Sequence, residues 1–324
     1  MTPVDVLSEV FDYMDRVLRR GVRSAAWILA AAFLLGGVPA VAQDILLQDA
    51  QIIYSGAPAE QANVKLGSWG NGVCEESNKN TYGGTRSVKI TPRGLYEGGR
   101  LDFPTPVDLT KQFNDRNAYL QLVALFGGVQ TGYDSWAVGL AAPGATDMYG
   151  GTTPKGKLVR RVQVMLYFEA RQAVECQVDL ASYKLAEDGW MTVSIPFAYL
   201  KEKLSLPEYK LSRLVCTGDG TEPFYVGEIR AVRDTTPLRA DAGEEKEVAK
   251  NYQIVFHAMA GTGASAVRYS WDFDKTDGLQ SEATGELIYH VFRRPGTFLV
   301  TLTVSDVFGL KEPAGSTIKV KVNE

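Results

Sequence analysis

The segment between residues 44 and 234 is a succession of short stretches with a period of two, separated by glycine, proline and asparagine. In the clearest stretch, Val164 and Leu166 lie on one face and Gln163 on the other. This alternation marks a half-buried β-strand, and only one short helix, at 197–203, is expected among the strands. The nine candidate strands are residues 45–54, 85–91, 97–103, 117–126, 158–170, 174–180, 190–196, 211–217 and 223–232. The pattern predicts an all-β sandwich.

The chain changes character between residues 234 and 250, where the sequence DTTPLRADAGEEKEVAK is polar, charged and free of aromatic side chains. Strand-like stretches resume after it and continue to the last residue. A polar segment of this kind marks a domain boundary, and a chain of 324 residues suits about two domains. We therefore predict a leader at 1–42, a first β-sandwich at 43–234 and a second at 235–324.

Two motifs dominate the second sandwich: RYSWDFDKTDG, which begins at Arg268, and RPGTFLVTLTVSD, which begins at Arg294. Tyr269, Trp271 and Phe273 share one face of a strand, and the second motif alternates in the same way. Two such faces can close a sandwich core. Three further motifs lie in order around them: ADAG at 240–243, YQIVF at 252–256 and YHVF at 289–292. Together they make the segment from about residue 237 to the end resemble a PKD domain, an immunoglobulin-like β-sandwich.

The PKD resemblance implies a spacer or adhesion module without chemistry of its own. The sequence departs from the family after WDF, where Asp274 to Gly278 replaces the usual Gly-Asp-Gly turn. Asp272, Asp274 and Asp277 raise the alternative of a calcium site. Their spacing does not fit an EF-hand loop, and Ala283 stands where that loop needs a glutamate. Turn formation is the favoured interpretation.

Three motifs in the first sandwich also follow a known pattern: GGTRSVKI at 83–90, WMTVSIP at 190–196 and FYVGEI at 224–229. They resemble the jelly-roll carbohydrate-binding modules of the galactose-binding-like superfold. The resemblance implies a jelly roll that binds a polysaccharide or a cell-surface glycan. It also implies a structural calcium held by Asp49 and Glu228, although Gly227 replaces the first acid of the closing motif. No other cofactor is expected.

Sugars are held by stacking on flat aromatic faces, with polar side chains nearby to hydrogen-bond the hydroxyls. Aromatic residues in predicted loops of the first sandwich are therefore the candidates for contact with a glycan. They are Trp69, Tyr133, Trp136 and Tyr149. The alternative for each is a ring that folds back and caps the sandwich edge. Trp190 opens a strand and is expected in the core.

Catalysis is not expected, because the only two histidines, His257 and His290, fall in the second sandwich. The first sandwich therefore lacks a Ser-His-Asp or Cys-His arrangement and any imidazole metal site. A hydrolase with two carboxylates is the remaining enzymatic alternative, and Glu75, Glu76, Asp102 and Glu169 are its candidates. A polysaccharide lyase is another, since Tyr167, Arg161 and Gln163 share one strand face. The net charge of −4 argues against nucleic acid as a partner.

The N-terminus has the features of a signal peptide. Arginines precede an apolar run at 25–38, and the small residues Ala40, Val41 and Ala42 predict cleavage before Gln43. The run is shorter than the roughly 20 residues of a membrane span, so no span is expected after cleavage. Met14 is an alternative start that gives a conventional leader. The mature protein is expected in the periplasm, on the cell surface or outside the cell.

The three cysteines, Cys74, Cys176 and Cys216, allow at most one disulfide in an exported protein. Cys216 has the parity of Leu214 in its strand, which favours a buried core thiol over a bridge. The sequence as a whole predicts an exported, non-catalytic glycan-binding protein with a PKD module. The alternative is a structural or adhesion protein of the cell envelope that binds protein partners.

Overall fold

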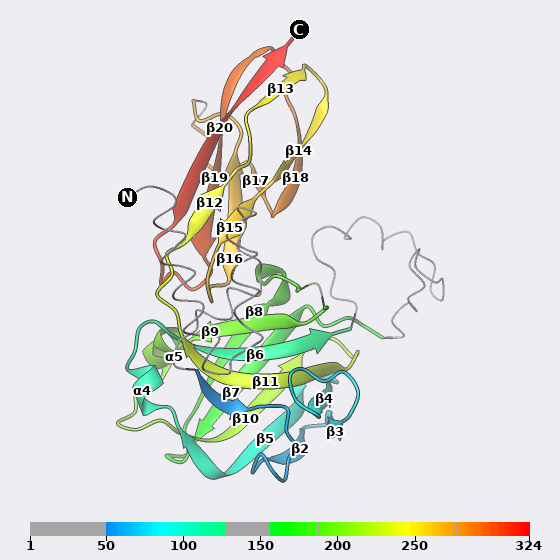
Figure 1. Cartoon of the computed structure of the whole chain (residues 1–324), viewed down its shortest axis with the longest axis vertical. Helices are drawn as coiled ribbons and strands as arrows, with labels where there is room; N and C mark the ends of the chain where they lie inside the picture. The colour runs from blue at the N-terminus through cyan, green and yellow to red at the C-terminus, as the bar shows by residue number, and fades with distance from the viewer. Residues whose placement is uncertain (1–49, 128–155, 187, 277) are drawn as a thin grey trace, which may run out of the picture. The chain divides into compact units, whose positions relative to one another are not determined.

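The computed structural model describes residues 50–127, 156–186, 188–276 and 278–324 (Figure 1). By their contacts, all the described residues lie in one compact unit. The regular secondary structure of the described residues is almost entirely β-strand, which confirms the predicted all-β fold. Within these ranges no helix is long and apolar enough to cross a membrane.

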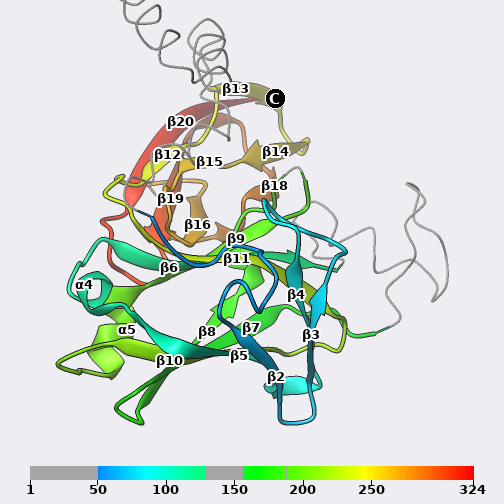
Figure 2. The same ribbon diagram turned by 60° about the horizontal axis from the view of Figure 1, so that its bottom comes forward.

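The first sandwich consists of two antiparallel sheets (Figure 2). One sheet has the order β3 (Val73–Ser77), β4 (Ser87–Thr91), β11 (Phe224–Arg233), β6 (Ala118–Phe126) and β9 (Met191–Pro196), with β1 (Gln51–Tyr54) also paired to β11. The other has the order β2 (Lys65–Trp69), β5 (Gly94–Asp108), β10 (Lys210–Gly218), β7 (Arg161–Phe168) and β8 (Ala173–Asp179). Because most neighbouring strands are not consecutive in sequence, the chain crosses repeatedly between sheets.

The two sheets pack face to face around one apolar core. Val88 and Leu122 of the six-stranded sheet lie in the same buried cluster as Leu101 and Leu166 of the five-stranded sheet. The period of two read from the sequence puts these side chains inward and leaves alternate positions on the outer faces.

Two short helices border the core. α5 (Phe197–Lys203) lies where the sequence predicts it and buries Phe197. α4 (Thr110–Phe113) is an addition to the sequence prediction of a single helix. Its Phe113 stacks on Tyr209 with ring centroids 3.8 Å apart and planes 3° from parallel. This single helical turn positions the Phe113 ring in the core, where it stacks on Tyr209.

All three cysteines are free. Cys216 is completely buried on the core side of β10, which confirms the prediction of a core thiol. Burial raises the pKa of the Cys74 and Cys176 thiols to about 11. These thiols are therefore protonated at neutral pH and act as small apolar side chains.

A second apolar cluster comes from residues 238–322. Its main sheet has the order β13 (Lys246–Ala249), β20 (Ala314–Asn323), β19 (Gly296–Asp306), β16 (Val267–Asp272) and β17 (Ala283–Thr284). Two further ribbons pair β14 (Gln253–His257) with β18 (Leu287–Val291) and β12 (Arg239–Asp241) with β15 (Met259–Gly261). β13 runs parallel to β20, and the other pairs are antiparallel.

The WDF motif forms the centre of this second core. Tyr269, Trp271 and Phe273 are 8%, 0% and 4% exposed, so the predicted apolar face is confirmed. The indole N–H of Trp271 donates to the carbonyl of Gly285 at 3.0 Å, which satisfies its one polar atom. Asp274 accepts hydrogen bonds from the backbone and hydroxyl of Thr276, as expected of a turn-forming aspartate.

Candidate functional site

Two of the six residues proposed for binding lie in the described ranges, namely Trp69 and Glu228. The others, Tyr133, Trp136, Tyr149 and Asp49, lie outside the described residues. Trp190 is 8% exposed and packs on Tyr82 with ring centroids 5.3 Å apart. It is therefore a buried residue, as the sequence predicts.

Trp69 is the last residue of β2, and the expectation that it lies in a loop is wrong. The stretch KLGSW lacks the apolar alternation of a half-buried strand, so its sequence does not predict a strand. It forms because β2 pairs with β5 over five residues, with Trp69 opposite Gly98.

The indole of Trp69 meets the ring of Tyr167, which comes from β7. The ring centroids lie 5.6 Å apart and the planes are tilted by 52°. Two strands, β5 and β10, lie between β2 and β7, a separation of roughly 14 Å at ordinary strand spacing. The two rings must therefore lean toward each other across the sheet, and both stay partly exposed.

Arg213 of β10 lies between these two rings. Its guanidinium carbon is 5.9 Å from the centroid of Trp69 and 5.9 Å from that of Tyr167. The register explains this position, because Arg213 is opposite Tyr167 on one side and Asp102 on the other. An Arg side chain between two aromatic rings presents its guanidinium N–H donors next to apolar ring faces.

Asp102 of β5 links two arginines. Its carboxylate forms an ion pair with Arg213, and its other oxygen lies 3.1 Å from Nε of Arg100. The three side chains are 25% to 36% exposed, so solvent screens these ion pairs only in part. The candidate hydrolase acid Asp102 is therefore an ion-pair partner in this face.

Gln163 of β7 is 3% exposed, although it belongs to the outer face. Its Nε2 donates to a carboxylate oxygen of Glu175 at 2.7 Å, while its Oε1 has no hydrogen-bond partner among the described residues. The Nε of Arg100 is also buried, and within the described part of the chain it makes no hydrogen bond besides its ion pair with Asp102. Buried polar atoms are normally paired, so the unpaired Oε1 of Gln163 is an exception on this face.

Arg161, which shares a strand face with Tyr167 in sequence, is not part of the Trp69–Tyr167–Arg213 cluster. Its guanidinium pairs with Asp219 at 3.3 Å at the other end of β7. Burial alone would raise the pKa of Asp219, but the backbone N–H groups of Arg161 and Arg160 and the Arg161 side chain hold it below its usual value. These hydrogen bonds and the ion pair hold the first residue of β7 in place.

Glu228 forms an ion pair with Arg230 at 3.0 Å, and both side chains are largely buried. Gly227 is required by packing, because a Cβ atom there would lie 2.4 Å from Cβ of Tyr82 and 2.9 Å from the Trp190 ring. The missing acid of the closing motif is thus explained. Among the described residues, no group of three or more His, Cys, Asp or Glu could hold a metal ion. A calcium site with Asp49 stays a prediction.

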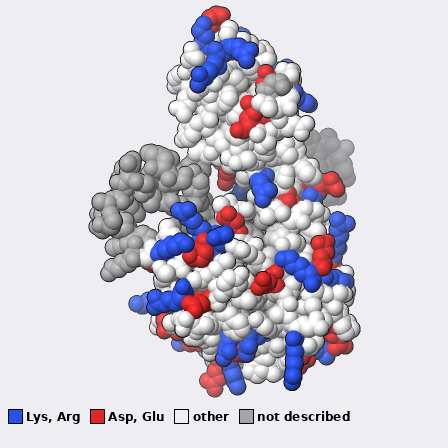
Figure 3. Space-filling model, turned by 180° about the vertical axis from the view of Figure 1, so that it is seen from behind, with Lys and Arg blue, Asp and Glu red and all other residues white. Residues whose placement is uncertain are grey.

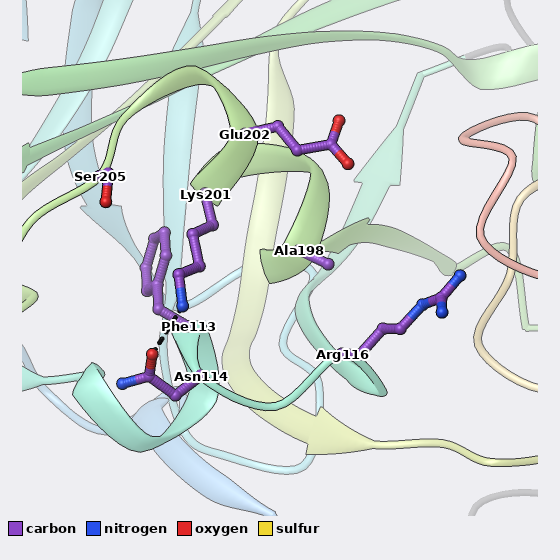
Figure 4. A pocket seen from close by; sticks show the side chains of 7 residues that line it. All are labelled: Phe113, Asn114, Arg116, Ala198, Lys201, Glu202 and Ser205. Carbon is purple, nitrogen blue, oxygen red and sulfur yellow. Dashed lines mark hydrogen bonds between the residues drawn. The ribbon is translucent and has the colours of Figure 1, made fainter.

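Two surface depressions lie elsewhere on this sandwich. One, of about 380 Å³, lies between α4 and α5, where Lys201 donates to Asn114 at 2.7 Å (Figure 4). Its only aromatic ring, that of Phe113, is 1% exposed and offers no stacking face. The other depression, of about 540 Å³, is lined mainly by polar residues of β3 and β4.

The candidate hydrolase acids Glu75 and Glu76 line the depression at β3 and β4. They are occupied by ion pairs with Lys89 at 2.7 Å and Arg86 at 2.9 Å. On the side of the molecule in Figure 3, cationic and anionic side chains are interspersed in this way. The Trp69–Tyr167–Arg213 cluster brings two partly exposed aromatic rings and a cation together, on the face that also includes Gln163.

Comparison with known proteins bears on the second core. Residues 235–322 match the family model of the PKD domain. The PKD resemblance read from the sequence is confirmed over this span. A solved PKD domain from KIAA 1837 protein is 23% identical, covers 28% of this chain and 92% of its own, and has a TM-score of 0.20.

Two other solved structures come from Clostridium thermocellum. The CBM22-1-GH10 modules of xylanase 10B, complexed with xylohexaose, are 11% identical, cover 57% of this chain and 31% of their own, and have a TM-score of 0.28. Fibronectin(III)-like modules of CbhA are 10% identical, cover 53% of this chain and 82% of their own, and have a TM-score of 0.23. No curated protein matches the chain.

Proposed function

We propose that the protein is an exported, non-catalytic glycan-binding protein. Its ligand site is the outer face of the sheet β2-β5-β10-β7-β8, and its PKD module is a spacer or adhesion element. The observation that carries this proposal is the pair of partly exposed rings, Trp69 and Tyr167, with Arg213 between them. Export is supported by the signal-peptide pattern that ends at Ala42.

The two rings are poorly placed for a purely structural role. They lie on the face opposite the apolar core, and neither belongs to the buried cluster that joins the two sheets. A Trp that only closed a sandwich edge would gain more by burial, as Trp190 does at 8% exposure. Partly exposed aromatic side chains with polar groups around them are typical of small-ligand and sugar sites.

The arrangement also offers what a sugar needs besides stacking. Arg213 and Arg100 supply donors, and Asp102 and the Oε1 atom of Gln163 supply acceptors. All of them lie within the central strands β5, β10 and β7, which run side by side. A chain of sugars could lie across these strands with one ring on Trp69 and another on Tyr167.

A second candidate is a polysaccharide lyase, favoured by the proximity of Tyr167 to Arg213. In such a reaction the Tyr oxygen removes the proton next to the uronate carboxylate, the glycosidic C–O bond breaks, and the leaving oxygen takes a proton. The product contains a carbon–carbon double bond, which absorbs ultraviolet light. The protein is expected to produce no such absorbance.

The test is affinity electrophoresis of the mature chain, Gln43 to Glu324, in gels that contain polygalacturonate, alginate, xylan or mixed-linkage β-glucan. Retardation by at least one polysaccharide, lost in a Trp69→Ala/Tyr167→Ala variant, is the expected result. Tyr252→Ala is a matched control, because Tyr252 is 66% exposed and belongs to the PKD module. Normal migration of the folded protein in every gel would favour the structural or adhesion alternative.

A further inference from the structure

We infer that the ligand is an acidic polysaccharide whose carboxylates are bound by Arg213 and Arg100, with Gln163 accepting a hydrogen bond from a neighbouring hydroxyl. The inference rests on the proposed function and names its ligand class. Its basis is an excess of positive charge on the outer face of the five-stranded sheet, together with the unpaired buried Oε1 atom of Gln163 there.

The excess of positive charge follows from the register of three strands. Asp102 of β5 is opposite Lys65 of β2 and opposite Arg213 of β10, and its carboxylate also contacts Arg100. Two arginines therefore contact one carboxylate, and Lys65 lies opposite it on the neighbouring strand. Glu175, which accepts a hydrogen bond from Gln163, is the second acid beside this group. Three cations thus stand against two acids, and the remaining positive charge is one that an anionic ligand would balance.

Arg100 and Gln163 lie on either side of β10. Arg100 is opposite Val215, and Gln163 is opposite Thr217, two residues further along the same strand. Both side chains thus lie on the same outer face, where Arg100 forms an ion pair with Asp102 and the amide oxygen of Gln163 has no partner among the described residues. Leaving a buried oxygen unpaired is unfavourable, and a ligand hydroxyl that pairs it recovers the loss.

A uronic acid fits this pattern better than a neutral sugar. Its planar carboxylate matches the guanidinium fork, and its ring face suits Trp69 or Tyr167. A hydroxyl of a further sugar along the chain suits the oxygen of Gln163, which lies four residues from Tyr167 along β7. A neutral sugar would stack equally well on the rings but would leave the arginines with only Asp102. The site is therefore expected to bind an acidic polysaccharide more tightly than a neutral one that stacks equally well.

The experiment compares polygalacturonate with its methyl ester, which keeps the sugar rings and removes the charge. Dissociation constants come from affinity electrophoresis, corrected by migration in polysaccharide-free gels. Since a charged hydrogen bond strengthens binding substantially, esterification is expected to weaken binding about tenfold or more. Added salt is expected to weaken binding of the acid and to leave binding of the ester unchanged.

Three variants separate recognition from folding. Arg213→Gln is expected to weaken binding of the acid about tenfold, with little change for the ester. Asp102→Asn is expected to strengthen binding of the acid, because it frees both arginines, whereas damage to the fold would weaken it. Arg233→Gln is the matched control, since Arg233 is an exposed arginine of β11, in the other sheet, and pairs with Asp115. Each variant is checked for wild-type thermal unfolding.

Equal affinity for the acid and its ester would overturn this inference and leave the proposed function intact. The same holds if Arg213→Gln weakens binding of both forms equally. If neither form binds, and no neutral polysaccharide binds either, the proposed function fails and the inference fails with it. Binding of the acid alone, with opposite effects of Arg213→Gln and Asp102→Asn, supports both.

Discussion

Replacement of Trp69 by alanine is expected to remove most of the binding while leaving the protein folded. A Trp side chain can bury up to about 250 Å², and a sugar on its partly exposed face covers roughly a third of that, about 80 Å². At about 25 cal/mol per Å² the loss is about 2 kcal/mol, or roughly 30-fold in Kd. Trp69→Phe, which keeps a smaller ring, should give an intermediate loss.

The cost of the same change to stability is expected to be smaller. The folded protein loses the ring contact with Tyr167 and the contact with the Arg213 guanidinium, together about 1–2 kcal/mol. Binding is measured by affinity electrophoresis on the polysaccharide that retards the wild type, and stability by urea unfolding. A Trp69→Ala protein that binds normally would refute the reasoning, as would a loss of binding explained by unfolding.

Two further predictions concern the framework. Trp271→Ala is expected to destabilise the PKD module by about 3–5 kcal/mol, because the ring is fully buried and its N–H bonds Gly285; urea unfolding checks this. Asp219→Asn is expected to cost about 1.5 kcal/mol at neutral pH, since the hydrogen bonds of Arg160 and Arg161 go to a charged group. The depressed pKa of Asp219 means that its contribution is present above about pH 4 and is lost as the pH falls through the folded-state pKa. Thermal unfolding at neutral and acidic pH should therefore show the Asp219→Asn deficit shrinking in acid, and a constant deficit would contradict this assignment.

Local sequence patterns were sufficient for most strands. The alternation of residues 161–168 places Val162, Val164 and Leu166 in the core, as found. The PKD module was recognisable because its motifs are core residues in a fixed order. β2 and β3 were missed, since neither has apolar alternation: β2 depends on pairing with the distant strand β5, and β3 on pairing with the next strand, β4.

The candidate site was only half predictable. Trp69 was found as a Trp among small and polar residues, and Tyr167 as part of an exposed strand face. Arg213 was missed because the ladder shifts register between Leu211 and Arg213. This bulge lets two residues of the same parity face opposite sides, with Leu211 buried in the core and Arg213 outside. The alternation pattern of the sequence does not reveal such a change of face.

The central claim is that a glycan binds across Trp69 and Tyr167, and Trp indole resonances test it most directly. Trp69 is partly exposed, whereas Trp190 and Trp271 are buried, so their N–H signals should respond differently. The mature chain, labelled with nitrogen-15 at Trp and assigned by Trp→Phe variants, is titrated with fragments of the polysaccharide that retards it. The account predicts that the Trp69 signal moves while those of Trp190 and Trp271 stay in place. A bound polysaccharide that leaves the Trp69 signal unmoved, or that moves only Trp136, would contradict it.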